Sequence, residues 1–497
     1  MTLVEAGLSG PERSRRQTRR LCTWLSYAYG ALVAAGIGYF LWDVPVQVSD
    51  SYGNIVTASQ GTLGSLISSE FHQRAFLRPF LWGLLRVVLD LSRGHYFEWF
   101  RGWHIAQIAV LIVLFLRLVR PSTWSGAAAV PIGLAALIGM HTFAGTVQEA
   151  FPINTFMTVL ICTFAAADLA LGPAGPAPPK RWAIMRAAGR DVTAALLFVF
   201  AALTVESGLL IGVVFVAAYL VGARGVSRAG IGVQFALIAA YFVLRFAILH
   251  VGSPGLEERQ SGFGFSSLSP DDLVARFGPN PLPFYAYNVV SSWLTVFLSE
   301  PRGGTWGFTR DLLRGAPSPT ALVNVVASML GSFLLGLYAW RRRNDWRARR
   351  FDRADRLVLV FIVVAAANAV LSYGYTKDVI LSPAGAFFAV ALAVASQHFL
   401  ESIGHMPSRH AAAAIVMVAV LSTTWSFRAI GAHLGLRASA SALRGEWAYV
   451  DLWLERKSQV PTDPFAIALK RRLEDDAVRR HPLRPMLAGE WTEWFPE

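Results

Sequence analysis

Charged residues are scarce in this sequence, and so are cysteines. Asp, Glu, Lys and Arg make up 15% of the 497 positions, whereas hydrophobic residues make up 54%. Soluble domains carry far more charge, so most of this chain must lie in lipid. The two cysteines, Cys22 and Cys162, each fall inside an apolar stretch and far from the other. They predict neither a disulfide nor a metal site, and small apolar packing is the favoured interpretation.

The usual signatures of nucleotide- and zinc-dependent enzymes are also missing from the sequence. It has no P-loop, no G-x-G-x-x-G after a strand, no H-E-x-x-H and no Cys/His metal spacing. No basic region is interleaved with base-stacking aromatic residues, so we expect no nucleic-acid partner despite a net charge of +13. We predict no metal-ligating residue, and the sequence leaves a requirement for a divalent metal open.

Apolar stretches long enough to cross a membrane recur along the whole chain. A helix of roughly 17–25 apolar residues crosses a ~30 Å hydrocarbon core with its backbone hydrogen bonds satisfied. We therefore predict an all-α polytopic membrane protein with about eleven transmembrane helices. They lie near residues 22–41, 104–119, 125–141, 152–171, 191–205, 207–222, 229–249, 320–340, 356–373, 379–398 and 410–429.

Arginine and lysine in the short connections set the predicted orientation. PERSRRQTRR near the N-terminus carries five arginines, and residues 341–356 carry eight. These runs, together with residues 117–120, 180–190 and 224–228, fall on one side if residues 284–299 form an interfacial helix and not a span. Positive residues resist translocation, so this side is predicted to be cytoplasmic. The first span lacks a small-residue cleavage site and is interpreted as a retained anchor.

This orientation divides the chain into regions. We predict a basic cytoplasmic N-terminus (1–21), a transmembrane domain (22–430) and an extracytoplasmic C-terminal tail (431–497). The transmembrane domain includes two large outer loops, 43–103 and 250–319. Helical spacing of apolar residues over 80–91 predicts an amphipathic helix on the membrane plane within the first loop.

Ionisable groups at or inside a span are costly and therefore functional candidates. The acidic candidates are Asp50, Glu149 in a short outer loop, and Glu206. Asp50 could instead form a turn with Ser51 and Gly53. Glu206 could instead cap the helix that follows it. The first cationic candidate is Arg245, which lies in a span and therefore either needs an anionic partner or snorkels to the headgroups. Two further charged groups lie on the outer face. These outer-face groups are Arg78 and the pair Lys377–Asp378.

The order of these landmarks resembles the C-type superfamily of integral-membrane glycosyltransferases that use polyprenyl-phosphate sugars, and in particular its mannosyltransferase-like branch. The resemblance covers about residues 20–430 and runs through Asp50, RPF (78–80), WFRGWH (99–104), HTFAGTVQEAF (141–151), TVESGLL (204–210), YFVLRFAIL (241–249) and GYTKDVILSPAG (374–385). Departures are Ser51 in place of a second acid, Val205 in place of lysine, and the wide separation of His141 from Glu149.

The resemblance implies a polyprenyl-phosphate sugar as donor and a glycan, lipid or protein as acceptor, on the outer face of a bacterial inner membrane. It implies Asp50, or next Glu149, as catalytic base, with Arg78, Arg245, Lys377, Asp378 and Glu206 around the lipid phosphate. Alternatives are a lipid-linked-saccharide transporter, an inactive transferase-like subunit, and an O-antigen-type ligase or polymerase. The sugar, the acceptor and the lipid carrier are not encoded in any recognisable motif.

Overall fold

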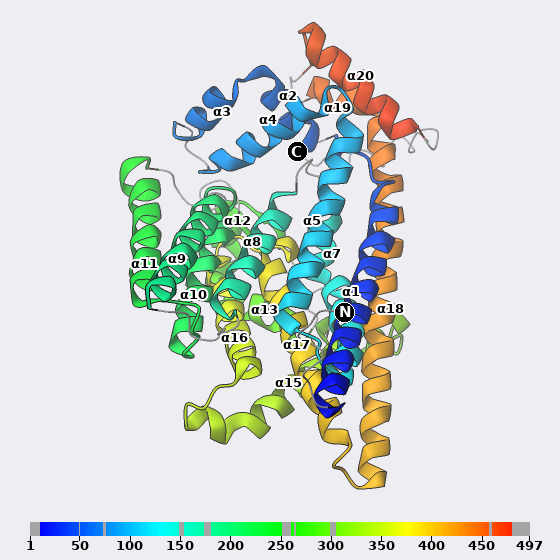
Figure 1. Cartoon of the computed structure of the whole chain (residues 1–497). Coiled ribbons are helices and arrows are strands. Elements are labelled where there is room, and N and C mark those ends of the chain that lie inside the picture. The colour runs from blue at the N-terminus through cyan, green and yellow to red at the C-terminus, as the bar shows by residue number, and fades with distance from the viewer. Residues whose placement is uncertain are drawn as a thin grey trace.

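The computed structural model of the chain describes residues 10–48, 50–72, 76–148, 154–172, 180–250, 260–262, 265–298, 305–456 and 460–479. Figure 1 shows long helices bundled in the lower part of the molecule and short helices layered above them. Almost every element is helical, which confirms the predicted fold class. The described exception is a two-stranded antiparallel ribbon of β1 (Gln260–Gly262) and β2 (Phe265–Leu268).

Helices occupy all eleven predicted spans. Seven of them satisfy length and composition for crossing a membrane, and α6 joins α7 (His141–Gln148) across a 64° bend. The chain is thus an integral membrane protein, whereas the number eleven stays a prediction because several of the helices are short. The long elements are α1 (Gly10–Leu41), α5 (Tyr96–Val119), α6 (Trp124–Gly139), α8 (Thr155–Ala170), α9 (Lys180–Ala202), α10 (Leu210–Leu220), α11 (Arg228–Phe242), α15 (Pro319–Arg347), α16 (Arg353–Leu371), α17 (Ser382–Ile403) and α18 (Ser408–Trp447).

Helix α17 is the centre of the bundle. In its most apolar window 94% of the residues are buried inside the protein. Small residues allow its neighbours to approach closely: a Cβ added to Gly133 of α6 would lie 2.6 Å from the Ala393 Cβ of α17. Without a hydrophobic driving force in lipid, such close packing is a principal source of helix association.

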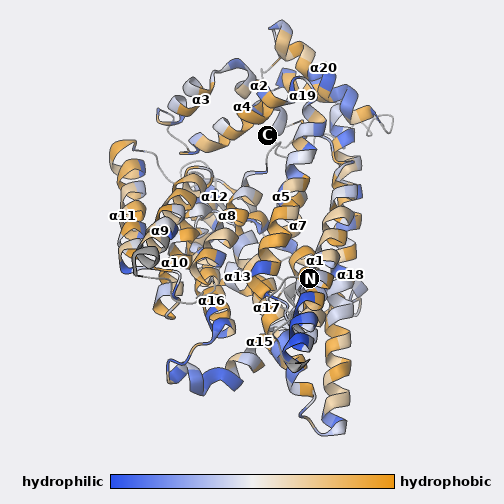
Figure 2. Cartoon of the chain, in the orientation of Figure 1, coloured by the Kyte–Doolittle hydropathy of each residue, from blue (hydrophilic) through white to orange (hydrophobic). Residues whose placement is uncertain are grey.

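One end of the bundle gathers the basic segments of the sequence. Arg353 donates to the carbonyls of Arg117 and Leu118, and Arg356 donates to the Val221 carbonyl at 3.1 Å. Thr23 of α1 donates to the Pro121 carbonyl at the same end. Figure 2 shows hydrophilic residues at the lower ends of α1, α15 and α16. The packing is therefore consistent with the prediction that these connections lie on one side of the membrane. The assignment of this end to the cytoplasm remains a prediction from positive charge.

The opposite end carries a layer built from the first loop and the C-terminal tail. It consists of α2 (Asp50–Gln60), α3 (Leu63–Glu70), α4 (Pro79–Ser92), α19 (Val450–Arg456) and α20 (Pro464–Val478). Their apolar faces share a second core, in which Leu85 and Leu89 of α4 meet Leu469 and Leu473 of α20. The predicted helix at 80–91 exists, and its apolar face contributes to this core.

The C-terminal tail is continuous with the last span. Helix α18 extends to Trp447, well past residue 429, where the predicted span ends. A helix of 40 residues is longer than a hydrocarbon core is thick. The indole of Trp447 donates to the Val46 carbonyl at 2.7 Å. Lys470 of α20 pairs with Asp451 of α19 at 2.9 Å, so the charged residues from Lys470 to Asp476 belong to a packed helix.

The second large loop contains α12 (Pro270–Phe277), α13 (Leu282–Leu298) and α14 (Thr305–Leu313). Helix α13 covers the segment predicted to be interfacial. Its Phe297 ring contacts the rings of Phe361 in α16 and Phe388 in α17. The carbonyl of Phe297 accepts a hydrogen bond from Ser332 of α15 at 2.7 Å. The C-terminal part of α13 thus packs among candidate spanning helices, not on a separate surface layer.

Candidate functional site

Three of the candidate residues, far apart in sequence, meet in one ion cluster. Arg78 donates to Glu206 at 2.8 Å and Arg245 donates to the other carboxylate oxygen at 3.2 Å. The side chains of Arg78 and Glu206 are about one-quarter exposed, whereas Arg245 is 5% exposed. The three groups sum to one positive charge. Glu206 therefore orients two guanidinium groups toward one carboxylate at a partly exposed surface.

Glu206 sits in a tight turn between two antiparallel helices. The 3-10 helix η2 (Glu206–Leu209) joins α9 to α10, so the chain turns between the predicted spans 191–205 and 207–222. Gly208 packs directly on the end of α9, since a Cβ there would lie 2.2 Å from the Ala201 carbonyl carbon. The Glu-Ser-Gly sequence thus closes the turn at the end of the bundle away from the basic connections.

Arg245 is held in a widened turn of helix. It lies in the π-helix η3 (Val243–Ile248), which directly follows α11. Such one-turn π segments often occur at functional sites. The Tyr241 hydroxyl accepts a hydrogen bond from Arg245 at 2.8 Å. The predicted anionic partner of this buried arginine is the Glu206 carboxylate.

Arg78 comes from the layer above the bundle. It precedes α4, where Pro79 occupies the first helical turn. Proline has no backbone N–H, and at this position an N–H would have no partner within the helix. The Arg78 guanidinium lies 4.2 Å over the Phe76 ring. The Phe80 N–H donates to the Leu203 carbonyl, which ties the start of α4 to the end of α9. These contacts fix the layer to the bundle at the ion cluster.

A fourth ionisable group, Glu70, supports Arg78 from behind. Its carboxylate accepts the Arg78 backbone N–H at 3.1 Å and the Trp82 indole N–H at 2.7 Å. Burial raises the pKa of Glu70 above its ordinary value, while these hydrogen bonds and the Arg78 charge pull the pKa down. Glu70 was not among the predicted site residues, because no local pattern distinguishes it from other loop acids.

Lys377 and Asp378 stand at a different place on the same end of the molecule. The 3-10 helix η4 (Asp378–Leu381) begins at Asp378, which lies 3.8 Å from the His141 imidazole of α7. The Lys377 ammonium is exposed and lies 5.2 Å from the Tyr375 ring.

The start of α17 next to this place matches the expected Pro-small-Gly sequence. Pro383 lies in the first turn of the helix. A Cβ added to Gly385 would lie 2.1 Å from the Thr142 hydroxyl, so α7 and α17 require glycine there to pack. The glycine in this motif is explained by helix packing.

The two candidate bases are only partly covered by the structure. Asp50 is the first residue of α2, but its side chain lies outside the described residues, and so does Glu149. Helix α2 is nevertheless joined to α4, because Arg86 donates to the carbonyls of Ala58, Ser59 and Gly61 at 2.8–3.1 Å. The element that begins at Asp50 therefore packs on the element that begins beside Arg78.

The positions that depart from the family pattern are buried. Val205 is 4% exposed and Ser51 is fully buried. Val205 brings no cation to the carboxylate beside it, and in this chain Arg78 from the upper layer contacts Glu206 instead.

Arg428 is a buried cation that sequence reasoning missed. It lies on α18, is 8% exposed, stacks over Trp425 at 4.2 Å and donates to Ser328 at 2.8 Å. No carboxylate in the described parts of the chain pairs with it. Its position just inside the predicted boundary of the last span was the available signal. The same described residues contain no group of three or more His, Cys, Asp or Glu side chains that could hold a metal ion.

Comparison with known proteins gives one structural match. No protein-family model matches the chain, and no curated protein matches its sequence. The chain is similar to the crystal structure of ArnT from Cupriavidus metallidurans bound to undecaprenyl phosphate, with a TM-score of 0.44 and 14% sequence identity. The match covers 94% of this chain and 87% of that one. A likeness at this level establishes neither a family nor a function for this chain.

Proposed function

We propose that this chain is a glycosyltransferase that moves a sugar from a polyprenyl-phosphate carrier to an extracytoplasmic acceptor, with inversion at the anomeric carbon. The observation that supports this most is the Arg78–Glu206–Arg245 cluster. It is partly exposed, brings two guanidinium groups to one carboxylate and lies at the end of the bundle opposite the arginine-rich connections. Such a cluster suits a phosphate at a membrane surface.

In the proposed reaction the acceptor hydroxyl attacks the anomeric carbon of the donor sugar. A new carbon–oxygen bond forms, the bond to the phosphate oxygen breaks, and the hydroxyl proton passes to a carboxylate. Asp50 is the proposed base, with Glu149 as the second choice. The polyprenyl phosphate leaves with its negative charge stabilised by the guanidinium groups of Arg78 and Arg245.

Glu206 has a positioning role in this proposal. It holds both guanidinium groups in place before the donor arrives, so that little reorganisation is needed as charge develops on the phosphate. Tyr241 and the π turn of η3 hold Arg245 on the side of α11. The arrangement favours a transferase over a transporter, because a transporter is expected to place its charges near the bilayer midplane between repeated halves.

The test is transfer of radiolabelled sugar by the purified protein from a panel of polyprenyl-phosphate sugars. Asp50→Asn should lower turnover by roughly 10²–10⁴-fold, the contribution of a positioned acid–base group, while the protein keeps its fold. Glu149→Gln, assayed beside it, decides between the two acids. Near-normal turnover in both variants would exclude the proposed bases, and failure of the wild type with every donor would favour a non-catalytic, lipid-binding protein.

A further inference from the structure

A second basic site lies at the other end of the molecule. A hollow of about 700 Å³ opens between the end of α10 and the connection from α15 to α16. Four arginines and two aspartates line it, together with apolar residues from both sides. The lining residues are Leu220, Val221, Gly222, Arg342, Asp345, Arg349, Arg350, Phe351, Asp352 and Arg356.

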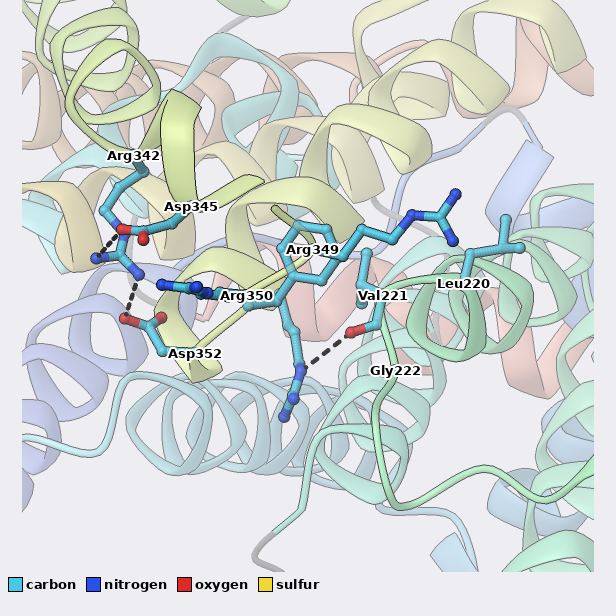
Figure 3. A pocket seen from close by; sticks show the side chains of 10 residues that line it. Leu220, Val221, Gly222, Arg342, Asp345, Arg349, Arg350 and Asp352 are labelled. Atoms are coloured by element: carbon cyan, nitrogen blue, oxygen red, sulfur yellow. Dashed lines mark hydrogen bonds and ion pairs between the residues drawn. The ribbon is translucent and has the colours of Figure 1, made fainter. Parts of the chain in front are cut away.

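Arg342 and the acids form the fixed wall of this hollow. Arg342 pairs with Asp345 at 2.9 Å and with Asp352 at 3.2 Å, and it reaches the buried Asp355 at 2.7 Å. Figure 3 shows the first two of these pairs at one side of the pocket. This wall holds more carboxylates than cations, and the other three arginines bring the four arginines and two aspartates of the lining to a net charge of +2.

Those remaining arginines are Arg349, Arg350 and Arg356. Arg356 is oriented by its hydrogen bond to the Val221 carbonyl. The backbone N–H of Arg350 donates to the Asp345 carbonyl at 2.8 Å, which closes the turn after α15. Arg349 adopts a positive φ of 55°, a conformation that costs energy in a residue with a Cβ. Among the described residues, no carboxylate forms an ion pair with any of the three.

The rim of the hollow is apolar on one side. Leu220, at the end of α10, is 73% exposed, and Tyr219 before it is 37% exposed. In a bilayer these side chains contact acyl chains, while the arginines lie at headgroup level. A phosphate with lipid tails can use both surfaces at once, whereas a free phosphate uses only the arginines.

We propose that this hollow binds the phosphate headgroup of an anionic membrane lipid, held by Arg349, Arg350 and Arg356. Guanidinium groups bind phosphate through charge-assisted, often paired hydrogen bonds, and basic pockets between helices on the cytoplasmic side are suited to such headgroups. The site is separate from the Arg78–Glu206–Arg245 cluster and does not depend on glycosyl transfer.

The experiment measures lipid retained by the purified full chain in native mass spectrometry. The probes are phosphatidylglycerol, phosphatidylcholine and inorganic phosphate. The double variant Arg349→Gln/Arg350→Gln should bind phosphatidylglycerol roughly tenfold or more weakly than the wild type. The control Arg343→Gln/Arg347→Gln removes the same charge from the last turns of α15, at residues that do not line the hollow, and it should bind nearly as well as the wild type.

Two results would overturn the proposal. Equal losses in both double variants would mean that charge alone attracts the lipid and that no site exists. Full displacement of phosphatidylglycerol by inorganic phosphate would identify free phosphate as the occupant. Unfolding midpoints of both variants close to the wild-type value keep loss of fold from imitating loss of binding, because the three arginines form no ion pairs that hold the described structure together.

Discussion

Two arginine–carboxylate clusters lie at opposite ends of this bundle, and they are assembled in different ways. At the outer end, Glu206 contacts Arg78 and Arg245, which are 128 and 39 residues away in sequence. At the basic end, Arg342 contacts Asp355 only 13 residues away. The outer cluster therefore joins three separate elements, whereas the basic one closes a single hairpin between α15 and α16.

The two carboxylates also differ in how completely they are satisfied. Asp355 is fully buried and accepts hydrogen bonds from Tyr338, Arg342, Trp346 and its own helix cap at 2.7–3.0 Å. Glu206 remains 27% exposed and lies in a turn. A fully satisfied carboxylate stabilises a structure, whereas a partly exposed one with surplus cations beside it can exchange partners when an anion arrives. We interpret the Arg342–Asp355 cluster as structural and the Arg78–Glu206–Arg245 cluster as functional.

The largest expected effect on stability comes from the basic end. Arg342→Met would leave the Asp355 charge buried without its cation, so we expect a loss of about 3 kcal/mol in the free energy of unfolding. Thermal unfolding in detergent measures the change. Arg343→Met is the control, because Arg343 contacts only the Trp340 ring and carbonyl among the described residues. Equal effects of the two changes would contradict a structural role for the Arg342–Asp355 pair.

A smaller loss of stability is expected at the outer end. Glu206→Gln removes a charge that is about one-quarter exposed, and we expect a loss of about 1–2 kcal/mol. The same variant should lower the rate of sugar transfer more than its stability loss explains, because Arg78 and Arg245 are no longer held together. A double-mutant cycle with Arg78→Gln measures their coupling. A coupling energy near zero would show that the observed pair contributes little.

Local patterns describe more of the basic end than of the outer one, although only its positive charge was predicted and neither Asp352 nor Asp355 was. Asp352 and Asp355 at the start of α16 form a capping box, and the eight arginines all lie within residues 341–356, so local patterns carry the information. The outer residues Arg78, Glu206 and Arg245 were predicted one by one, but their meeting depends on how α4, η2 and η3 pack. No spacing in the chain encodes that contact.

Other features of the site were beyond local patterns as well. The π turn around Arg245 has no sequence signature of its own, and Glu70 gains its role from the Arg78 N–H and the Trp82 indole. Helix α18 continues without a break past the predicted span 410–429 into the upper layer. Apolar composition marks where a helix enters lipid, and it does not mark where the helix ends.

The smallest expected effect is a pH dependence at the outer end. Burial raises the pKa of Glu70 above the value of about 4.5 that it has when exposed. The folded state therefore holds the proton more tightly than the unfolded state. The resulting stabilisation is fully present below pH 4.5 and is lost as the pH rises through the raised pKa.

Glu70→Gln cannot titrate, so it should remove this dependence. It also gives up one of two hydrogen bonds, which adds a constant loss at every pH. The unfolding midpoint of wild type and variant, measured from pH 4 to pH 8, separates the slope from the offset. A difference between the two proteins that does not change with pH would show that the pKa of Glu70 is the same in the folded and unfolded states, and it would contradict the raised pKa.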